Sequence, residues 1–476
     1  MAHEDMACLR PHTGSAEPAS PGAPHVAPPH RGDGAHRRLS QTQLWAVRLG
    51  LAILLAFGVF ARDALALALH GAFVAAFLGV GGIKLAACLT PRARTGTPWL
   101  ADPDLPHYTV IAPLYREAGV AAQLADNLAR LDYPRDRLQA LIVLEEDDPE
   151  TLAAFLALDL PAFIQVLVAP NGAPRTKPRA CNVALQRALG SLVVIFDAED
   201  APHPLQLREA AARFAAAPPT LACLQAPLRV DPELDFIRAQ FRLEYAAQFE
   251  VMLPALARWG LPFPLGGTSN HFRAEALRAV GGWDAYNVTE DADIGFRLAA
   301  AGYGLDVISS PTQEPAPQTF RQWIPQRGRW VKGHMQTLAV HLRGPVVRTP
   351  RGLAGLLLTL MLSVVSSSVH APIMAWTLVG MIWLALAGDG PVINGLDLTV
   401  ALFGWSASSI AAALGLARAG ERARWRDLVG SAAYWPLQSL AAARALWQWI
   451  REPYRWDKTP HAPRPLRPLP GARMAK

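Results

Sequence analysis

The stretch LVVIFDAED, residues 192–200, decides how the central part of this chain is expected to fold. Five apolar residues lead into three acids, Asp197, Glu199 and Asp200. A short, wholly apolar run that stops at polar residues is typical of a strand buried on both faces, as in a parallel sheet covered by helices. Ligands of such sheets bind at the carboxyl ends of the strands. The three acids are therefore candidates for a functional site, with a polar loop after a strand as the plainer alternative.

Similar runs occur at residues 108–114 (YTVIAPL), 140–146 (ALIVLEE) and 163–169 (FIQVLVA). They alternate with helical stretches, which predicts an α/β domain with a mostly parallel sheet over residues 104–345. Within it, residues 236–260 carry apolar side chains at three- and four-residue steps. This pattern predicts an amphipathic helix, which we place at a membrane interface in preference to the domain core.

The acids after residue 196 also suggest a particular metal. Mg²⁺ and Mn²⁺ prefer hard oxygen ligands, take only one or two protein carboxylates, and leave the remaining positions to phosphate and water. We therefore expect Asp197, Glu199 and Asp200 to hold Mg²⁺ or Mn²⁺.

The composition favours a membrane protein over one that binds nucleic acid. Hydrophobic residues make up 51% of the 476 residues and charged residues 18%. The chain is basic, with a pI of about 9.3, but its arginines lie mostly beside apolar segments, as the positive-inside rule describes. No helix-turn-helix, zinc-finger or RNP-type pattern is found. Four scattered cysteines without a CxxC argue against disulfides or a zinc site.

Apolar runs long enough to span a bilayer lie on both sides of the α/β part. Residues 41–92 predict two transmembrane helices, and residues 352–450 predict three to four transmembrane or interfacial helices. We expect residues 353–387 to form two spans broken near His370 and Pro372. In the four-span version the arginine-rich residues 415–426 face outward, which conflicts with the positive-inside rule.

The flanking segments complete the expected organisation. Residues 1–40 are rich in Pro, His, Gly and Ala and predict a disordered tail, while residues 451–476 predict a cytoplasmic tail. The basic residues 36–38 precede the first apolar run, so the rule places the α/β domain in the cytoplasm. The expected location is the bacterial inner (plasma) membrane, crossed several times.

Three further segments carry chemistry-bearing side chains. TKPRACNVAL, residues 176–185, puts Lys177 before an apolar helix, where a cation and a helix N-terminus suit a diphosphate. VTEDAD, residues 288–293, crowds acids at a helix start, which by itself is equally typical of dipole complementation. QRGRW, residues 326–330, offers guanidinium groups and an indole face, or alternatively a basic juxtamembrane helix.

The order of the motifs along the chain resembles that of membrane-integrated family 2 glycosyltransferases. The motifs are the strand acids, the basic helix start, DAED, the GG turn of residues 264–273, TED and QxxRW. That family has a GT-A (Rossmann-like) catalytic domain and includes cellulose synthases and related polysaccharide synthases. The resemblance covers about residues 104–343 and extends to the apolar helices on both sides. Residues 434–461 are also similar to bacterial members that end in a WxKTxH motif.

The resemblance implies a role for each matching position. Asp291 matches the general base of TED, with Glu290 beside it, and Asp293 remains a helix cap. Glu145 and Glu146 fall where relatives carry a DD pair that meets the nucleoside, so Asp147 or Asp148 is the alternative contact. The other implied roles are nucleotide and diphosphate binding by Tyr115, Glu117 and Lys177, metal binding by Asp197, Glu199 and Asp200, and binding of diphosphate and acceptor by Gln326, Arg329 and Trp330.

The function so implied is an inverting, metal-dependent transfer of a hexose from a nucleotide sugar, UDP-Glc or GDP-Man, to a growing β-linked polysaccharide, processive and coupled to export. About six membrane segments favour this reading, because transfer of a single sugar needs no tunnel. The alternative is transfer to a lipid acceptor, as in ceramide glucosyltransferases, and a non-enzymatic membrane protein is a third hypothesis. The FxVTxK gating motif and an appended cyclic-di-GMP-binding barrel are missing, which favours a β-hexan other than cellulose.

Overall fold

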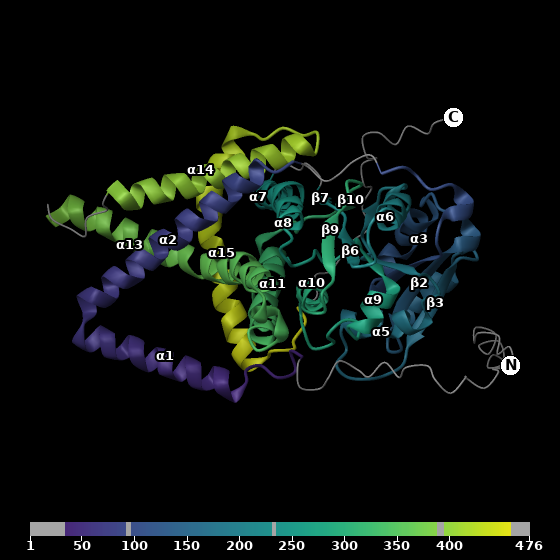
Figure 1. Ribbon diagram of the computed structural model, residues 1–476, viewed down its shortest axis with the longest axis horizontal. Helices are drawn as coiled ribbons and strands as arrows, with labels where there is room; N and C mark the ends of the chain where they lie inside the picture. The colour runs from purple at the N-terminus through teal and green to yellow at the C-terminus, as the bar shows by residue number, and fades with distance from the viewer. Residues whose placement is uncertain (1–33, 92–96, 231–234, 388–394, 458–476) are drawn as a thin grey trace.

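The computed structural model describes residues 34–91, 97–230, 235–387 and 395–457. Most of the expected N-terminal tail and of the expected C-terminal tail therefore lies outside the described residues. The molecule has an α/β part at one end and long apolar helices that extend from the other (Figure 1).

A seven-stranded sheet forms the centre of the α/β part, with the strand order β3-β2-β1-β4-β8-β6-β9. β1 pairs in parallel with β2 and with β4, whereas β8 runs antiparallel to its neighbours β4 and β6. The sheet is thus mixed and α/β, with a parallel half built from the apolar runs of the sequence. Its strands are β1 (Tyr108–Leu114), β2 (Leu138–Glu145), β3 (Ile164–Ala169), β4 (Leu192–Ile195), β6 (Leu221–Gln225), β8 (Asn270–Arg273) and β9 (Gly304–Val307).

Helices cover both faces of this sheet, so successive residues of a strand enter different cores. In β1, Ile111 packs into one buried cluster with residues of α5, while Val110 and Ala112 pack into the other with residues of α3 and α6. Burial on both faces explains why these strands read as continuous apolar runs. The helices of this part are α3 (Ala121–Ala129), α4 (Pro149–Leu156), α5 (Lys177–Arg187), α6 (Gln206–Ala215), α9 (Ala274–Ala279) and α10 (Glu290–Ala300), with short 3-10 turns η2 (Asp102–Asp104), η3 (Ala118–Val120) and η4 (Arg135–Arg137).

A second layer joins the sheet to the apolar helices. It contains a small sheet of β5 (Ala201–Pro202), β10 (Thr312–Glu314) and β7 (Leu228–Val230). The segment expected to be one amphipathic helix forms α7 (Phe236–Ala247), a π-helical turn η5 (Gln248–Met252) and α8 (Leu253–Arg258). It packs on α2, α14 and α15, and its apolar face is buried in the same cluster as Ile111. The long helix α11 (Phe320–His341) and the 3-10 turn η6 (Pro345–Arg348) complete the layer.

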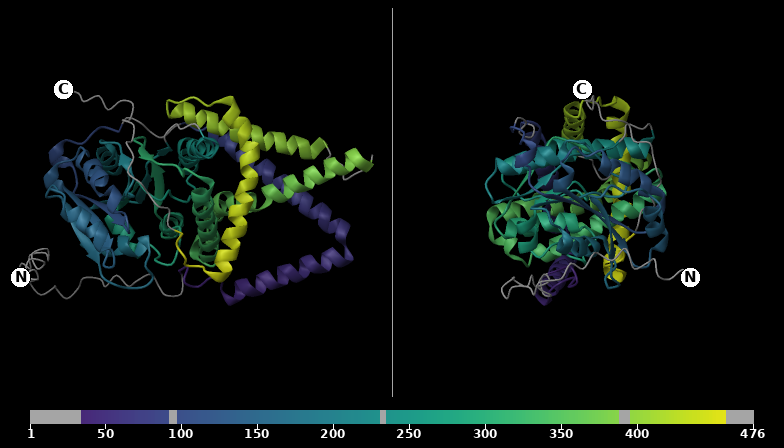
Figure 2. Two further views of the ribbon diagram at one scale, coloured as in Figure 1. Left: turned by 180° about the vertical axis from the view of Figure 1, so that it is seen from behind. Right: turned by 90° about the vertical axis from the view of Figure 1, so that its right-hand side faces the viewer.

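Within the described residues, four helices are long and apolar enough to cross a membrane. Two precede the α/β part, α1 (Gln41–Phe60) and α2 (Arg62–Cys88), and two follow it, Pro350–Ala387 and α14 (Gly395–Arg418). The third consists of α12 (Pro350–Gly355), the π-helical turn η7 (Leu356–Met361) and α13 (Leu362–Ala387). The last helix, α15 (Trp425–Arg451), is not among these four, and it crosses the others between them and the α/β part (Figure 2).

The expectation of two spans broken near His370 and Pro372 is wrong, because α13 continues through Pro372 without interruption. A proline inside a helix frees backbone groups, and neighbouring helices can satisfy them. Here the N–H of Ala371 donates to Ser439 Oγ of α15 at 3.0 Å. An even number of C-terminal spans would return residues 415–426 to the face of the α/β part, which removes the conflict with the positive-inside rule.

Candidate active site

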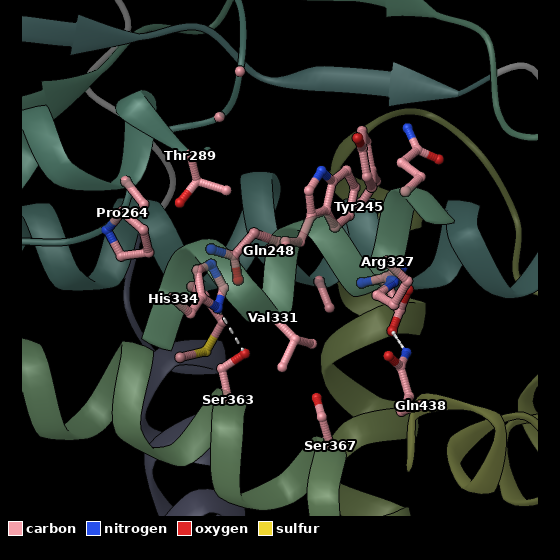
Figure 3. A pocket seen from close by; sticks show the side chains of 18 of the residues that line it. Tyr245, Gln248, Pro264, Thr289, Arg327, Val331, His334, Ser363, Ser367 and Gln438 are labelled. Carbon is pink, nitrogen blue, oxygen red and sulfur yellow. Dashed lines mark hydrogen bonds and ion pairs between the residues drawn. The ribbon is translucent and has the colours of Figure 1, made fainter. Parts of the chain in front are cut away.

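A cavity of about 1280 Å³ opens at the carboxyl ends of β1, β2 and β4 and continues between the apolar helices. Several elements of the α/β part contribute to its lining: Tyr115, Glu117, Glu145, Lys177, Asp197, Glu199, Gly267, Glu290 and Asp291. Further along, α11 contributes Gln326, Arg329, Trp330 and His334, and α13 contributes Ser363. Figure 3 shows this passage, where His334 of α11 meets Ser363 of α13. Of the predicted site residues, only Glu146 and Asp200 are absent from the lining.

The acids after β4 and the acids at the start of α10 face each other across Gly267. A Cβ atom at Gly267 would lie 3.5 Å from Asp291 Oδ2 and 3.9 Å from Asp197 Oδ2. Lys177 connects the same groups, because its Nζ lies 2.5 Å from Asp197 Oδ1 and 3.8 Å from Glu290 Oε1. It also donates to the carbonyl of Gly267 at 2.7 Å. One ammonium group thus neutralises carboxylates that lie far apart in the sequence.

The pKa values of these groups follow from burial and mutual charge. Burial raises the pKa of Glu290 to about 7; Lys177 opposes this rise and Asp291 adds to it. Burial also raises the pKa of Asp291. For Lys177, burial alone would lower the pKa, but the carboxylates of Asp197 and Glu290 outweigh it and raise the pKa above its usual value. A carboxylate whose pKa is moved toward neutral pH is suited to accept a proton.

Asp200 supports the loop that carries Asp197. It is fully buried, and its Oδ2 accepts the N–H of Asp197 at 2.7 Å and the hydroxyl of Thr268. Its other oxygen, Oδ1, has no hydrogen-bond partner in the described part of the chain. Burial, together with the charges of Asp197 and Glu199, raises the pKa of Asp200 well above its usual value. Asp200 is thus placed to fix the loop behind the cavity.

The acids at the end of β2 and directly after it lie in different environments. Glu145 is buried and pairs with Arg179 at 3.0 Å, whereas Glu146 is exposed and accepts the N–H of Asn171. Asp148 caps α4 by accepting the N–H of Thr151 at 3.2 Å. Asp147 accepts the hydroxyl of Tyr115 at 3.4 Å.

The segment before Asp291 is held directly by α11. Asn287 Nδ2 donates to Thr337 Oγ1 at 3.0 Å, and the N–H of Val288 donates to Gln336 Oε1 at 3.1 Å. Gly333 allows the closest approach, since a Cβ atom there would lie 2.1 Å from Thr289 Oγ1. The TED and QxxRW segments are therefore fixed to one another by backbone proximity and hydrogen bonds.

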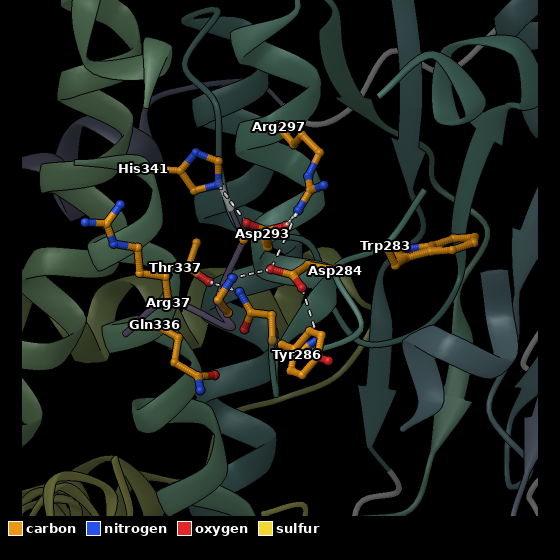
Figure 4. Close-up of polar contacts among 12 residues, drawn as sticks. Arg37, Trp283, Asp284, Tyr286, Asp293, Arg297, Gln336, Thr337 and His341 are labelled. Atoms are coloured by element: carbon orange, nitrogen blue, oxygen red, sulfur yellow. Dashed lines mark hydrogen bonds and ion pairs between the residues drawn. The ribbon is translucent and has the colours of Figure 1, made fainter. Parts of the chain in front are cut away.

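The expectation that Asp293 caps α10 is wrong. Asp293 is the fourth residue of the helix, fully buried, and it pairs with Arg297 and with His341 Nε2 at 2.9 Å (Figure 4). Burial would raise its pKa, but these two partners outweigh burial and lower the pKa below its usual value. Asp293 therefore fastens α10 to α11, and the residue before the helix, Thr289, makes no capping bond through its side chain.

The three QxxRW residues all reach the cavity, but with different neighbours. The Trp330 ring lies beside Phe241 and Tyr245, with centroids 5.7 and 6.3 Å away. Gln326 Oε1 is buried without a hydrogen-bond partner among the described residues. The other arginine of this segment, Arg327, also lines the cavity and pairs with Glu244.

Sequence reasoning missed Trp456, which also lines the cavity. The Arg329 guanidinium lies 5.2 Å from the Trp456 ring centroid. The segment that carries it is bound along α11: Lys332 Nζ donates to the carbonyl of Arg455 at 2.7 Å, and Gln336 Nε2 donates to that of Pro453 at 2.9 Å. The WxKTxH motif was the available signal, but spacing along the chain does not reveal that a tail folds back on α11.

No group of three or more His, Cys, Asp or Glu side chains is arranged to hold a metal ion within the ranges the structure describes. Two carboxylates, those of Asp197 and Glu199, do line the cavity beside Lys177. This donor set fits Mg²⁺ or Mn²⁺ shared with a diphosphate, because such ions keep few protein ligands.

The chain is similar to known glycosyltransferases. Residues 192–389 match the family model described as Glycosyl transferase family group 2. The chain is 23% identical over 248 residues to a probable glycosyltransferase, YdaM, of Bacillus subtilis. The matched region is 48% of this chain and 56% of that protein. The chain is 28% identical over 236 residues to a beta-monoglucosyldiacylglycerol synthase of Synechocystis, which covers 48% of each. The chain thus spans about half the length of the curated relatives it matches.

Among solved structures, the mannosyltransferase PcManGT from Pyrobaculum calidifontis, in complex with GDP-Man and Mn²⁺, superposes with a TM-score of 0.54 at 21% identity. The match covers 81% of this chain and 99% of that one. The chain shares the fold of that mannosyltransferase, and residues 192–389 are similar to the family group 2 glycosyltransferases.

Proposed function

We propose that this chain is a membrane-bound, inverting glycosyltransferase that transfers a hexose from a nucleotide sugar to a lipid-linked acceptor. One observation carries the proposal: a single cavity joins the carboxylates Asp197 and Asp291 to the space between α2, α13 and α14. A water-soluble donor can enter at the sheet, and an acceptor anchored in a bilayer can enter between the helices.

The residues at the sheet end of the cavity, where the nucleotide sugar would bind, suggest how the reaction would proceed. Asp291 accepts the proton of an acceptor hydroxyl while that oxygen bonds to the anomeric carbon of the sugar. On the opposite face, the bond from the anomeric carbon to the diphosphate oxygen breaks, and the charge of the leaving diphosphate is balanced by Lys177 and Arg329. One displacement inverts the centre, so an α-linked donor gives a β-linked product. A positioned base contributes roughly 10²–10⁴-fold.

Asp197 and Glu199 would hold the divalent cation, with Asp200 fixing their loop. When bound, Mg²⁺ or Mn²⁺ would supply positive charge to the leaving diphosphate. Asp197 already carries a cationic neighbour, Lys177, at 2.5 Å. The lysine and the cation would therefore divide the carboxylate charge between them.

The candidate spans favour a lipid-linked acceptor over a growing polymer. Four candidate spans are found in the described ranges, fewer than the six on which the polymer hypothesis rested. At most 33% of the most apolar 18-residue stretch of any of them is buried, and α1 has no buried residue. A tunnel for a glycan needs helices packed on all sides. UDP-Glc and GDP-Man remain the proposed donors.

A second candidate, a processive β-glycan synthase, is favoured by one specific observation. The cavity face of α12 to α13 carries hydroxyl and imidazole groups, which are suited to line a path for sugar hydroxyls: Thr359, Ser363, Ser366, Ser367 and His370.

A donor screen separates the two candidates. The full chain in lipid nanodiscs would receive Mg²⁺ or Mn²⁺ with labelled UDP-Glc, GDP-Man, UDP-GlcNAc or UDP-Gal. We expect label in the lipid extract and a loss of about 10²–10⁴-fold in Asp291→Asn, with Asp136→Asn, an exposed aspartate outside the cavity, as the matched control. Label in a high-molecular-weight product would select the synthase instead. Unchanged transfer by Asp291→Asn would refute the assigned base.

A further inference from the structure

The membrane end of the cavity has a polar wall on an otherwise apolar helix. Thr359, Ser363, Ser366 and His370 follow one another at steps of four, three and four residues, and Ser367 lies four residues after Ser363, so they share one helix face. All five line the cavity. The neighbouring helix α14 adds Ser408 and Ser409, and Ser409 Oγ is buried without a hydrogen-bond partner among the described residues.

Lys84 of α2 supplies a cation to this polar region. It lines the cavity, and its Nζ donates to Ser408 Oγ at 2.8 Å. The described residues place no carboxylate oxygen within 4 Å of Nζ. An ammonium group has three donors, so two are left for a ligand.

The contact between α2 and α14 that positions Lys84 is unusually close. A Cβ atom at Gly81 would lie 2.4 Å from the ring of Phe403, so any larger residue would require that ring to move. Gly81 precedes Lys84 by three residues and therefore lies on the same helix face. The Arg418 guanidinium further fixes α14 to the end of α2 by donating to the carbonyl of Thr90 at 2.7 Å.

The depth of Lys84 suits a lipid headgroup. It lies four residues before Cys88, where α2 ends, which corresponds to about 6 Å along a helix. Ionisable groups within membrane spans are rare and commonly mark ligand sites. A lysine that only extends to the interface would lie on the outer surface, whereas Lys84 points into the cavity that contains the proposed catalytic groups.

We propose that Lys84, with the hydroxyl groups of α13 and α14, binds a phosphate in the headgroup of the acceptor lipid. This inference rests on the proposed function, since it names the acceptor class. The bound phosphate is not the attacking group; a hydroxyl farther along the headgroup is the one that reaches Asp291. Both a glycerophospholipid and a polyprenyl diphosphate sugar have this chemistry, whereas diacylglycerol does not.

The test compares acceptors in micelles of a polyoxyethylene detergent, which carries no phosphate of its own, and the added lipid is phosphatidylglycerol, a polyprenyl diphosphate sugar or diacylglycerol. We expect the full chain to prefer one of the phosphate-bearing lipids, and the preferred one identifies the source. Lys84→Met should raise the apparent KM for that lipid by about tenfold or more, without changing the KM for the nucleotide sugar. Lys84→Arg should keep the KM for that lipid near the wild-type value. Arg48→Gln, which removes an exposed cation from α1, should not change the KM for either substrate.

Binding is measured separately, so that failure of the proposed function is distinguishable. In the Asp291→Asn background, native mass spectrometry would follow retained phosphatidylglycerol and polyprenyl diphosphate sugar with and without Lys84→Met. Loss of retention on Lys84→Met supports the phosphate site even if transfer turns out to form a polymer. The inference would be overturned if the protein retained the phosphate-bearing lipids equally well with and without Lys84→Met. It would also be overturned if Lys84→Met lowered activity with diacylglycerol as much as with the phosphate-bearing lipids.

Discussion

Two lysines line the same cavity, and their surroundings are opposite. Lys177 has two carboxylates within 4 Å, those of Asp197 and Glu290. Lys84 donates to a serine hydroxyl and has no carboxylate at that distance in the described ranges. A cation already paired with acids is fixed in place and balances charge that the protein itself carries. A cation whose hydrogen-bond partner is a neutral hydroxyl group keeps its charge available to a ligand. This difference supports the proposed donor and acceptor ends of the cavity, and it does so without reference to sequence motifs.

The largest effect is expected from removing the cation at the sheet end of the cavity, which tests the role given to Lys177. Lys177→Met leaves Asp197 and Glu290 without their neutralising partner and takes a positive charge from the leaving diphosphate. We expect kcat to fall by about 10²–10³-fold, the size of effect seen when one preorganised donor is lost. Steady-state rates with each acceptor lipid would measure it. Arg187→Met, at the exposed end of the same helix, is the matched control.

The acceptor preference should not change in Lys177→Met. If this variant altered the choice between phosphate-bearing and neutral lipids as strongly as Lys84→Met does, the two ends of the cavity would not be separate sites.

The pH dependence sharpens the comparison, because the sheet end contains an acid, Glu290, with a pKa near neutrality. Glu290 has a pKa of about 7, so the ionised site becomes populated as the pH rises. We expect kcat/KM to increase about tenfold per pH unit below this value and to level off above it. Glu290→Gln should abolish the inflection, whereas Glu275→Gln, an exposed glutamate, should retain it.

Stability should follow the opposite direction. The native protein holds the Glu290 proton at pH values where the unfolded chain has released it, so the free energy of unfolding falls as the pH rises from about 4.5 through 7. Thermal unfolding of the wild type and of Glu290→Gln across this range would show whether the slope belongs to Glu290. A slope that persists in Glu290→Gln would contradict the assignment.

The sequence predicted the parallel half of the sheet well, because strands buried on both faces leave continuous apolar runs such as residues 192–196. Most of the site residues that it selected line the cavity. It failed where distant segments decide the outcome. Pro372 continues its helix because Ser439, far along the chain, accepts the freed N–H of Ala371.

The wrong prediction for Asp293 has a similar cause. Asp293 resembles a cap by its position near a helix start, yet Arg297 and His341 bind it inside the protein. The membrane end of the cavity was not recognised either. Its serines and Lys84 lie on three helices, and no local pattern indicates that they meet.

The smallest effect is expected from the contact that joins α11 to the TED segment. Gly333→Ala would place a methyl group 2.1 Å from Thr289 Oγ1, the residue before Glu290. Overpacking of this kind costs about 1–3 kcal/mol of unfolding free energy, and it should displace Asp291 relative to Trp330. Gly344→Ala, whose nearest neighbour would be at 3.5 Å, is the control. Thermal unfolding and the KM for each substrate would be measured together. Because the displaced residues lie at the sheet end, kcat should fall while the preference for a phosphate-bearing acceptor persists. A change in that preference would mean that α11 transmits strain to the membrane end, and the two ends would then act as one site.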